Sequence, residues 1–146
     1  MEKKLNEGRI CIREGKVFID GLRAFDGVAC TIAVTPETAE SRLLGDKTPS
    51  TRWIGLKITA SMTRARRTKW GKEVIKKYLD SGETPEFTIQ GIMDDKSSDY
   101  YRKFGAETVT AAGCVPTGEF NLISLDGESN TLLTDVTTFA VKELII

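Results

Sequence analysis

Two long stretches of this chain alternate strictly between apolar and small polar positions. Their apolar positions are Val28, Cys30, Ile32 and Val34 in the first stretch and Ile54, Leu56, Ile58, Ala60 and Met62 in the second. The alternate positions are Ala29, Thr31, Ala33 and Thr35, then Gly55, Lys57, Thr59, Ser61 and Thr63. This period of two is typical of a β-strand with one buried face. We therefore expect two long strands, each with an apolar face and a face of small, often hydroxylated side chains.

Shorter strands are expected on both sides of this pair. Residues 8–20 predict a hairpin around Glu14-Gly15, and Asp20-Gly21 is the next turn signal. Strand-like segments follow at residues 84–93, 106–115, 119–125 and 132–144, with a turn at Asp126-Gly127.

The period changes between these strands. Trp70, Val74, Tyr78 and Leu79 fall at helical spacing, while the opposite face carries Lys69, Lys72, Glu73, Lys76 and Lys77. The pattern predicts one amphipathic helix at about 69–80, which ends at Asp80-Ser81-Gly82.

The segment between the two long strands, about 37–52, is polar and has no periodicity. Pro36 is expected to end the first strand, and Gly45-Asp46 and Pro49 favour turns. We predict a long loop here, of the kind that is usually functional or mobile.

Six or seven strands and one helix predict a fold that is mainly β with one α-helix (α+β). The expected architecture is an antiparallel β-sandwich or barrel-like fold with the helix packed on the side. The length of 146 residues fits a single domain over 1–146.

The charge and the cysteines restrict the class of function. Lys+Arg and Asp+Glu both number 21, so the net charge is zero, which argues against a dedicated nucleic-acid binder. We see no apolar run of bilayer length and no signal peptide, so we expect a cytoplasmic protein that does not bind membranes. Cys11, Cys30 and Cys114 lack CxxC spacing and are expected to be reduced thiols packed as small hydrophobes.

Candidate catalytic chemistry is sparse. The chain has no histidine, which removes Ser-His-Asp triads, Cys-His pairs and His-ligated zinc. Gly-rich phosphate loops are also missing. The adjacent Asp94 and Asp95 suggest a metal site, but neighbours on an extended segment point to opposite faces, so we expect the polar tip of a hairpin. We predict no catalytic residue, no cofactor and no enzyme.

Two features leave alternatives open. Arg64, Arg66 and Arg67, with Trp53 and Trp70, could bind single-stranded nucleic acid by stacking and charge, or could be a solvated basic surface. The small hydroxylated strand faces could be an ordinary solvent face or the smooth lining of a channel. Long strands also expose edges that pair with partners.

Two further stretches carry a family resemblance. "GKVFIDG" (15–21) and "LDSGETPEFTIQGIMDDKSSDYYRKFGAETVTAAGC" (79–114) resemble the PBSX-like tail tube proteins of contractile phage tails. The shared features are an early G-x-x-F-x-D-G hairpin, a lysine-rich helix, a P-x-F-T-x-Q strand that leads into D-D-x-S-S, and an E-x-V-T strand. They occur in the family's order between about Gly8 and Leu144.

The resemblance implies a structural subunit that assembles into stacked hexameric rings around a hollow conduit, in a phage tail or a phage-tail-like bacteriocin. It implies as partners further copies of the chain, a tail sheath protein, a baseplate or tube initiator and a tape measure protein, with DNA at most passing through the lumen. Assembly would take place in the bacterial host cytoplasm, and the product would be the virion tail or a released tail-like particle.

The residues expected to face the lumen are Thr31, Ala33, Thr35, Lys57, Thr59 and Ser61. The residues expected in a loop that reaches the next ring are Glu40, Arg42, Leu44, Asp46, Lys47 and Arg52. The alternative is a small β-barrel module that binds single-stranded nucleic acid.

Overall fold

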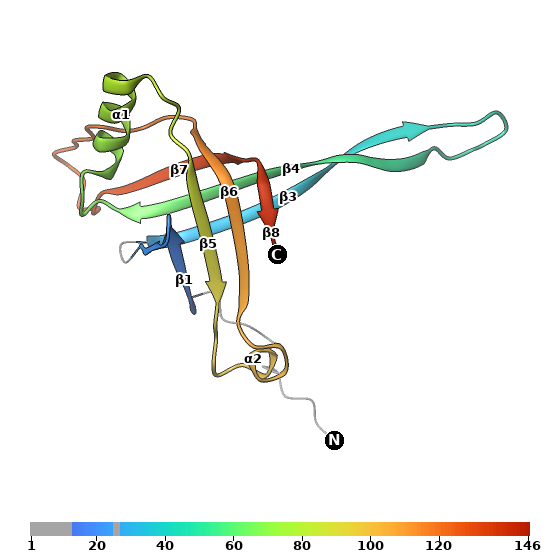
Figure 1. Cartoon of the computed structure of the whole chain (residues 1–146), viewed down its shortest axis with the longest axis horizontal. Coiled ribbons are helices and arrows are strands. Elements are labelled where there is room, and N and C mark those ends of the chain that lie inside the picture. The colour runs from blue at the N-terminus through green and yellow to red at the C-terminus, as the bar shows by residue number, and fades with distance from the viewer. Residues whose placement is uncertain (1–12, 25–26) are drawn as a thin grey trace.

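The computed structural model describes residues 13–24 and 27–146. Within them, eight antiparallel strands form one continuous sheet in the order β2-β1-β5-β6-β7-β4-β3, with β8 paired to β6 (Figure 1). The predicted fold class, mainly β with one main helix, is confirmed. Most of the first strand of the expected hairpin at 8–20, and Cys11, lie outside the described residues.

The sheet has two halves that cross at a wide angle (Figure 1). The strands of one half are β1 (Gly15–Ile19), β2 (Leu22–Arg23), β5 (Phe87–Met93), the first part of β6 (Glu107–Thr117) and β8 (Glu143–Ile145). The strands of the other half are β3 (Gly27–Ser41), β4 (Ser50–Ala65), β7 (Thr134–Val141) and the last part of β6. Because the two halves share β6 at a corner, they enclose a core between their inner faces.

The corner lies at Gly113 in β6. Before it, β6 pairs with β5 and β8, and after it Val115 to Thr117 pair with β7. Gly113 has a φ of 66°, in the left-handed region that favours glycine. Beside it, Lys142 separates β7 from β8 and donates its N–H to the Ala112 carbonyl at 3.3 Å. Both strands therefore turn the corner together.

The core fills the angle between the two halves. Its buried residues are Ala60, Met62, Ile89, Ala111, Cys114 and Phe139. Phe87 meets Phe139 edge to face, with ring centroids 6.3 Å apart. Of the apolar positions in the two alternating stretches, Ala60 and Met62 are buried in the core, and Cys30 and Ile32 pack against it. The expectation was wrong for Val28, Val34, Ile54 and Leu56, which are exposed because they lie toward the ends of the long hairpin, away from the core.

The predicted helix is confirmed as α1 (Trp70–Ser81). Gly82 ends it with a φ of 72°, and its N–H bonds the Tyr78 carbonyl at 2.7 Å. Trp70 anchors the first turn, with its ring 5.4 Å from that of Phe87. The turn expected at Asp20-Gly21 is also present, and the Asp20 carboxylate accepts the Thr88 N–H at 2.8 Å. That bond ties the turn after β1 to the neighbouring strand β5.

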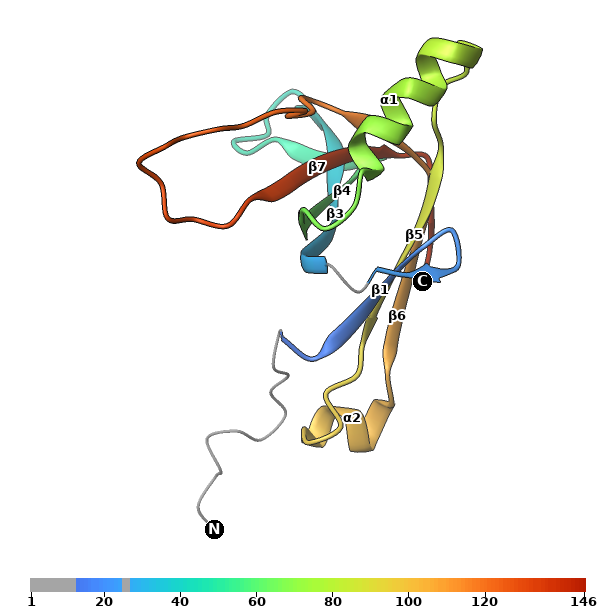
Figure 2. The same ribbon diagram turned by 90° about the vertical axis from the view of Figure 1, so that its left-hand side faces the viewer.

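Three local predictions were wrong. Residues 119–125 form no strand, because Gly118, with a φ of 86°, turns the chain out of the sheet. Residues 118–133 become a wide connection that projects away from α1 (Figure 2). In addition, the tip between β5 and β6 contains a second helix, α2 (Asp99–Phe104), which Ser98 caps by accepting the Tyr101 N–H at 3.2 Å. Six residues are too short to show a helical period in the sequence.

The segment predicted as a loop, about 37–52, is mostly strand. β3 runs through Pro36 to Ser41, and β4 begins at Ser50, so only residues 42–49 connect them. Pro36 is tolerated because β3 is an edge strand, where a missing N–H interrupts no ladder on the outer side. The alternation of apolar and polar residues is lost here because this part of the hairpin projects from the rest of the subunit, so both of its faces are exposed to solvent.

Candidate functional site

The six residues expected to face a lumen lie together on one surface. Strand pairing sets Thr31 opposite Ser61, Ala33 opposite Thr59, and Thr35 opposite Lys57. β7 extends the same surface, since Thr138 pairs with Ser61 and Ala140 with Thr59. We call these eight residues the small-residue face: Thr31, Ala33, Thr35, Lys57, Thr59, Ser61, Thr138 and Ala140. All are exposed except Ser61, which is half-buried.

The opposite face of the same strands is the core side. Cys30 pairs with Met62, and Ile32 with Ala60. Met62 is 1% exposed and Ala60 is 2% exposed, whereas their sequence neighbour Thr59 is exposed. The contrast between adjacent residues shows that the alternation in the sequence reports the two faces of a real sheet.

The chemistry of the small-residue face is that of a smooth, wetted wall. One of its eight residues is charged, and the others end in a methyl or hydroxyl group. The Thr138 hydroxyl donates to the Thr117 carbonyl at 2.7 Å, which holds that side chain against the sheet. Side chains this short offer few groups that could bind a ligand. That the face lines a lumen stays a prediction.

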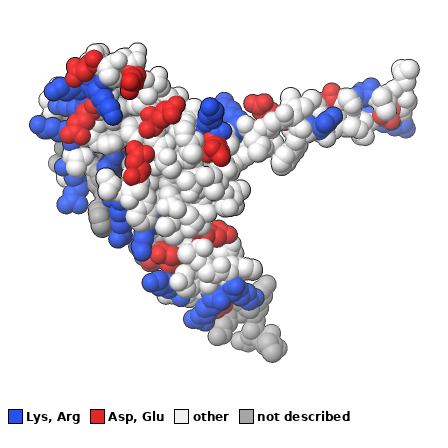
Figure 3. Space-filling model, in the orientation of Figure 1, with Lys and Arg blue, Asp and Glu red and all other residues white. Residues whose placement is uncertain are grey.

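A hairpin arm projects from the body. Ile58 to Arg64 of β4 lie between β7 and β3, whereas Ser50 to Lys57 have β3 alone as their neighbour. We call residues 35–57 the arm. Figure 3 shows it standing clear of the body, with basic and acidic side chains along it.

The six residues expected to contact a neighbouring ring all lie on the arm and are exposed. Glu40 belongs to β3 and Arg52 to β4, while Arg42, Leu44, Asp46 and Lys47 lie in the connecting turn. The Asp46 carboxylate accepts the Leu43 N–H at 3.3 Å, and Gly45 has a φ of 89°. A defined turn therefore closes the arm. The contact with another ring stays a prediction.

Large apolar side chains on the arm face solvent. Leu44 is 106% exposed, Trp53 is 67% exposed and Ile54 is 64% exposed. Exposed apolar groups gathered on one projecting element are typical of a protein–protein contact. Local sequence patterns did not indicate this role for Trp53, which was expected to act with the arginines.

The structure does not bring Trp53 into the basic cluster. Trp53 lies on the arm, about 36 Å along β4 from Arg64, taking about 3.3 Å per residue. Trp70 packs on Phe87 and Phe120, with ring centroids at 5.4 and 6.4 Å. Trp70 lies beside the Arg64 guanidinium, whereas Trp53 lies far from the arginines, so the two tryptophans do not form one stacking surface.

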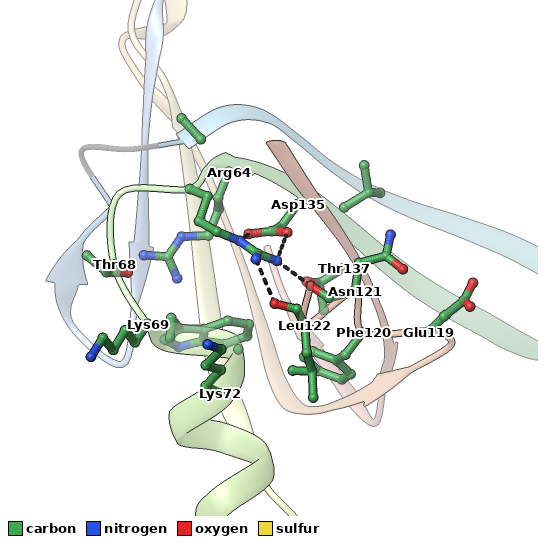
Figure 4. Close-up of a pocket in the computed structure, with 15 residues that line it drawn as sticks. Arg64, Thr68, Lys69, Lys72, Glu119, Phe120, Asn121, Leu122, Asp135 and Thr137 are labelled. Carbon is green, nitrogen blue, oxygen red and sulfur yellow. Dashed lines mark hydrogen bonds and ion pairs between the residues drawn. The ribbon is translucent and has the colours of Figure 1, made fainter. Parts of the chain in front are cut away.

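Arg66 instead has a structural role beside a pocket at the end of β4 (Figure 4). Its guanidinium forms a two-bond ion pair with Asp135, at 2.7 and 2.9 Å. It also donates to the Leu122 carbonyl at 2.9 Å and to the Asn121 carbonyl. The hydrogen bond to Asp135 raises the pKa of Arg66, so the guanidinium stays charged. Sequence reasoning missed Asp135, which is 69 residues away in the chain.

The same pocket combines aromatic, cationic and acidic residues. Trp70 and Phe120 contribute its aromatic surface, and Leu122 lines it beside them. The Arg64 guanidinium lies 5.2 Å from the Trp70 ring centre. Lys69, Lys72 and Glu119 complete the charged part of the lining. An aromatic side chain of a partner would fit such a site, since aromatic rings attract both apolar surface and cations.

The acidic stretch at Asp94 and Asp95 forms the tip between β5 and β6. The Asp95 carboxylate accepts the Ser97 N–H at 3.2 Å, and the Ser98 hydroxyl donates to the Asp95 carbonyl at 2.9 Å. Asp94 pairs with Lys16 at 3.6 Å. Asp and Ser thus bond nearby backbone, as expected for a hairpin tip. Within residues 13–24 and 27–146, no three potential metal-ligating side chains of His, Cys, Asp or Glu lie together.

The two described cysteines, Cys30 and Cys114, are unpaired thiols that contribute to the core. Burial raises the pKa of both thiols, and for Cys30 the nearby Cys114 adds to the effect. The Cys114 thiol donates to the Ala111 carbonyl at 3.2 Å. The protonated form is favoured, so these groups behave as small hydrophobes. None of the helices in the described part of the chain is long and apolar enough to span a bilayer.

Two of three comparisons with known proteins find similarity to this chain. A family model described as phage tail tube protein matches residues 5–144. A comparison with curated protein sequences finds no significant match. Several solved structures share the fold. A chain of the anti-feeding prophage tube-terminating cap is 11% identical, with a TM-score of 0.71 over 99% of this chain and 94% of that one.

Two further matches come from a sheath-tube complex and a baseplate. A chain of the PVC sheath-tube complex in the extended state is 13% identical, with a TM-score of 0.65 over 95% of this chain and 91% of that one. A chain of the six-fold symmetrised anti-feeding prophage baseplate is 11% identical, with a TM-score of 0.60 over 90% and 89%.

Proposed function

Because this chain belongs to the phage tail tube protein family, we propose that it closes into hexameric rings, which stack into the hollow inner tube of a contractile tail or tail-like particle. The family match covers nearly the whole chain, and the protein is a structural subunit of a tail tube. The six-fold symmetry of the baseplate that contains a similar chain supports the hexamer.

The small-residue face carries this proposal. Three strands place its side chains on a single exposed surface, while the reverse side of the same strands is core. In the ring, Thr31, Ala33, Thr35, Lys57, Thr59 and Ser61 line the lumen. A wall of short neutral side chains offers little that could hold a passing polymer in place.

The edge strand β3 supports ring closure. It is 15 residues long, and among the described strands only β4 pairs with it. Its outer edge presents backbone groups that another strand can pair with. Six copies joined edge to edge remove those open edges, because a closed ring of strands has none.

The arm supports stacking. In the tube, the turn and flanking residues of one ring contact the next ring through Glu40, Arg42, Leu44, Asp46, Lys47 and Arg52. These side chains are exposed and carry both signs of charge, so they suit a surface on an identical copy with zero net charge.

Further partners follow from the class of particle. A sheath protein around the tube and a baseplate or initiator at its end are supported by the sheath-tube complex and the baseplate in which similar chains occur. A tape measure protein in the lumen, DNA passing through it in an infectious particle, and assembly in the host cytoplasm complete the proposal. The single-domain subunit acts by shape and has no catalytic step.

Electron microscopy of the purified full-length protein over a concentration series tests the proposal. Six-fold rings or hollow tubes are the expected result. Monomers at every concentration, also after addition of a tail-tip complex, would contradict it. A salt-sensitive complex with a labelled oligonucleotide would then favour the nucleic-acid-binding alternative.

A further inference from the structure

We propose that Trp53 on the arm of one copy packs into the pocket at the opposite end of a second copy in the next ring. We define the pocket by the residues that face it from three segments: Arg64, Lys69, Trp70, Lys72, Phe120 and Leu122. The inference rests on the proposed stacking of rings and adds the receptor site for the arm.

The arm and the pocket lie at opposite ends of the same strands. The arm extends from one end of β3 and β4, and the pocket lies where β4 ends and β7 begins, beside the first turn of α1 (Figures 1 and 4). Identical rings stacked in one orientation bring one end of each copy against the opposite end of the next. The element that projects from one end therefore meets the pocket end of its neighbour.

The lengths of the two parts are compatible with this contact. The free part of β4, Ser50 to Lys57, and the part paired with β7, Ile58 to Ala65, each contain eight residues. Each part therefore spans about 26 Å at about 3.3 Å per residue. Because the arm is as long as the paired part of β4, it must run alongside a subunit of the next ring when the two rings touch. The end of that subunit which it reaches first is the end with the pocket.

The chemistry of Trp53 matches the pocket. Its side chain is 67% exposed, so a large apolar ring with one N–H donor faces water in the single subunit. The pocket offers the rings of Trp70 and Phe120, and the ammonium groups of Lys69 and Lys72 on its rim. Aromatic side chains in such pockets commonly dominate the affinity of an interface, and lysines beside an indole face add attraction.

The contact also limits the spacing of the rings. Trp53 and Ala65 are 12 residues apart on β4, or about 40 Å along the strand. If Trp53 of one copy reaches the pocket beside Ala65 of the next, the two copies are displaced by no more than about this length. Strands inclined to the tube axis give a shorter rise.

Crosslinking of assembled full-length protein tests the contact. Thr51→Cys places a thiol two residues from Trp53, on the same side of the strand, and Lys72→Cys places one at the pocket. With a short bis-maleimide, this double variant is expected to give a ladder of covalent multimers, since each arm joins a different copy. The control double variant, Thr51→Cys with Lys103→Cys, moves the second thiol to α2, and it is expected to give no more product than Thr51→Cys alone.

Substitution of Trp53 gives an independent readout. Trp53→Ala is expected to raise the critical concentration for tubes by about tenfold or more, while Trp53→Phe retains most of the assembly. Leu22→Ala removes an equally exposed apolar side chain from β2 and should change nothing. Tubes that form normally from Trp53→Ala, with equal crosslinking in both double variants, would overturn the inference. If wild-type protein forms no rings or tubes, the proposed function fails and the inference falls with it.

Discussion

Thr59 and Met62 lie three residues apart on β4 but face different environments. Thr59 is exposed between Ala33 and Ala140 on the neighbouring strands, whereas Met62 is 1% exposed and packs in the core. The two environments differ because side chains along a strand alternate between its two faces, so Thr59 and Met62 lie on opposite faces of β4.

This contrast predicts opposite outcomes for the same substitution. Met62→Asp should lower the free energy of unfolding by more than about 3 kcal/mol, because it leaves a charge buried without a partner. Thr59→Asp should stay within about 0.5 kcal/mol of wild type, as exposed substitutions usually do. Urea unfolding of the unassembled subunit, followed by tryptophan fluorescence, measures both. Equal losses would show that the two faces are assigned wrongly.

Arg66 is a second residue whose environment predicts its effect. It joins the end of β4 to Asp135 and to two carbonyls of the 118–133 connection. Arg66→Ala should lower the melting temperature and speed proteolysis within residues 118–133. Arg66→Lys should not restore either property, because an ammonium group cannot make the two-bond fork.

The neighbouring Arg67 provides the control for this prediction. Its side chain is exposed, and Arg67→Ala should leave the melting temperature and the cleavage pattern close to those of wild type. Identical behaviour of the two alanine variants would remove the structural role assigned to Arg66.

At the scale of elements, the corner of the sheet depends on one glycine. A Cβ at Gly113 would lie 3.0 Å from the Lys142 Cβ, an atom that cannot move without its backbone. Gly82 has a similar positive φ, but a Cβ there would meet no atom within 4 Å. An alanine at Gly82 therefore carries only the cost of the left-handed backbone conformation, whereas an alanine at Gly113 carries that cost and the cost of a clash.

Gly113→Ala should consequently destabilise the fold more than Gly82→Ala. The left-handed conformation alone costs an alanine about 1–2 kcal/mol, and the contact with Lys142 adds to this at Gly113. Urea unfolding of both variants gives the comparison. Equal losses at the two sites would show that the corner tolerates a side chain.

At the scale of the whole molecule, the prediction concerns access to the lumen. In a Cys11→Ser background, Thr59→Cys should react with a small maleimide in tubes but only slowly with a bulky one, which enters through the ends alone. Cys30 and Cys114 should contribute little, because burial raises their pKa and keeps them protonated.

Lys103→Cys, on α2, is the matched control for this labelling. It lies away from the small-residue face and should react with both reagents. In unassembled subunits, Thr59→Cys should do the same. Rapid labelling of Thr59→Cys in tubes by the bulky reagent would place the small-residue face on the outside.

The sequence by itself was sufficient for those features that depend on near neighbours. The period of two in β3 and β4 identified the core face and the small-residue face, and the period of 3.6 located α1 to within one residue. The turn at Asp20-Gly21 and the end of α1 at Gly82 were equally local. The ordered set of motifs identified the family, which the family match confirmed.

Only the tertiary structure decided where distant residues meet. Asp135 reaches Arg66 across 69 residues, Gly113 turns the sheet, and the polar segment after Pro36 continues as strand because β4 pairs with it. It also separated Trp53 from the arginines and placed it on the arm. Such contacts depend on long-range pairing, which leaves no period in the chain, so local patterns predicted the faces of the strands but not their extent or neighbours.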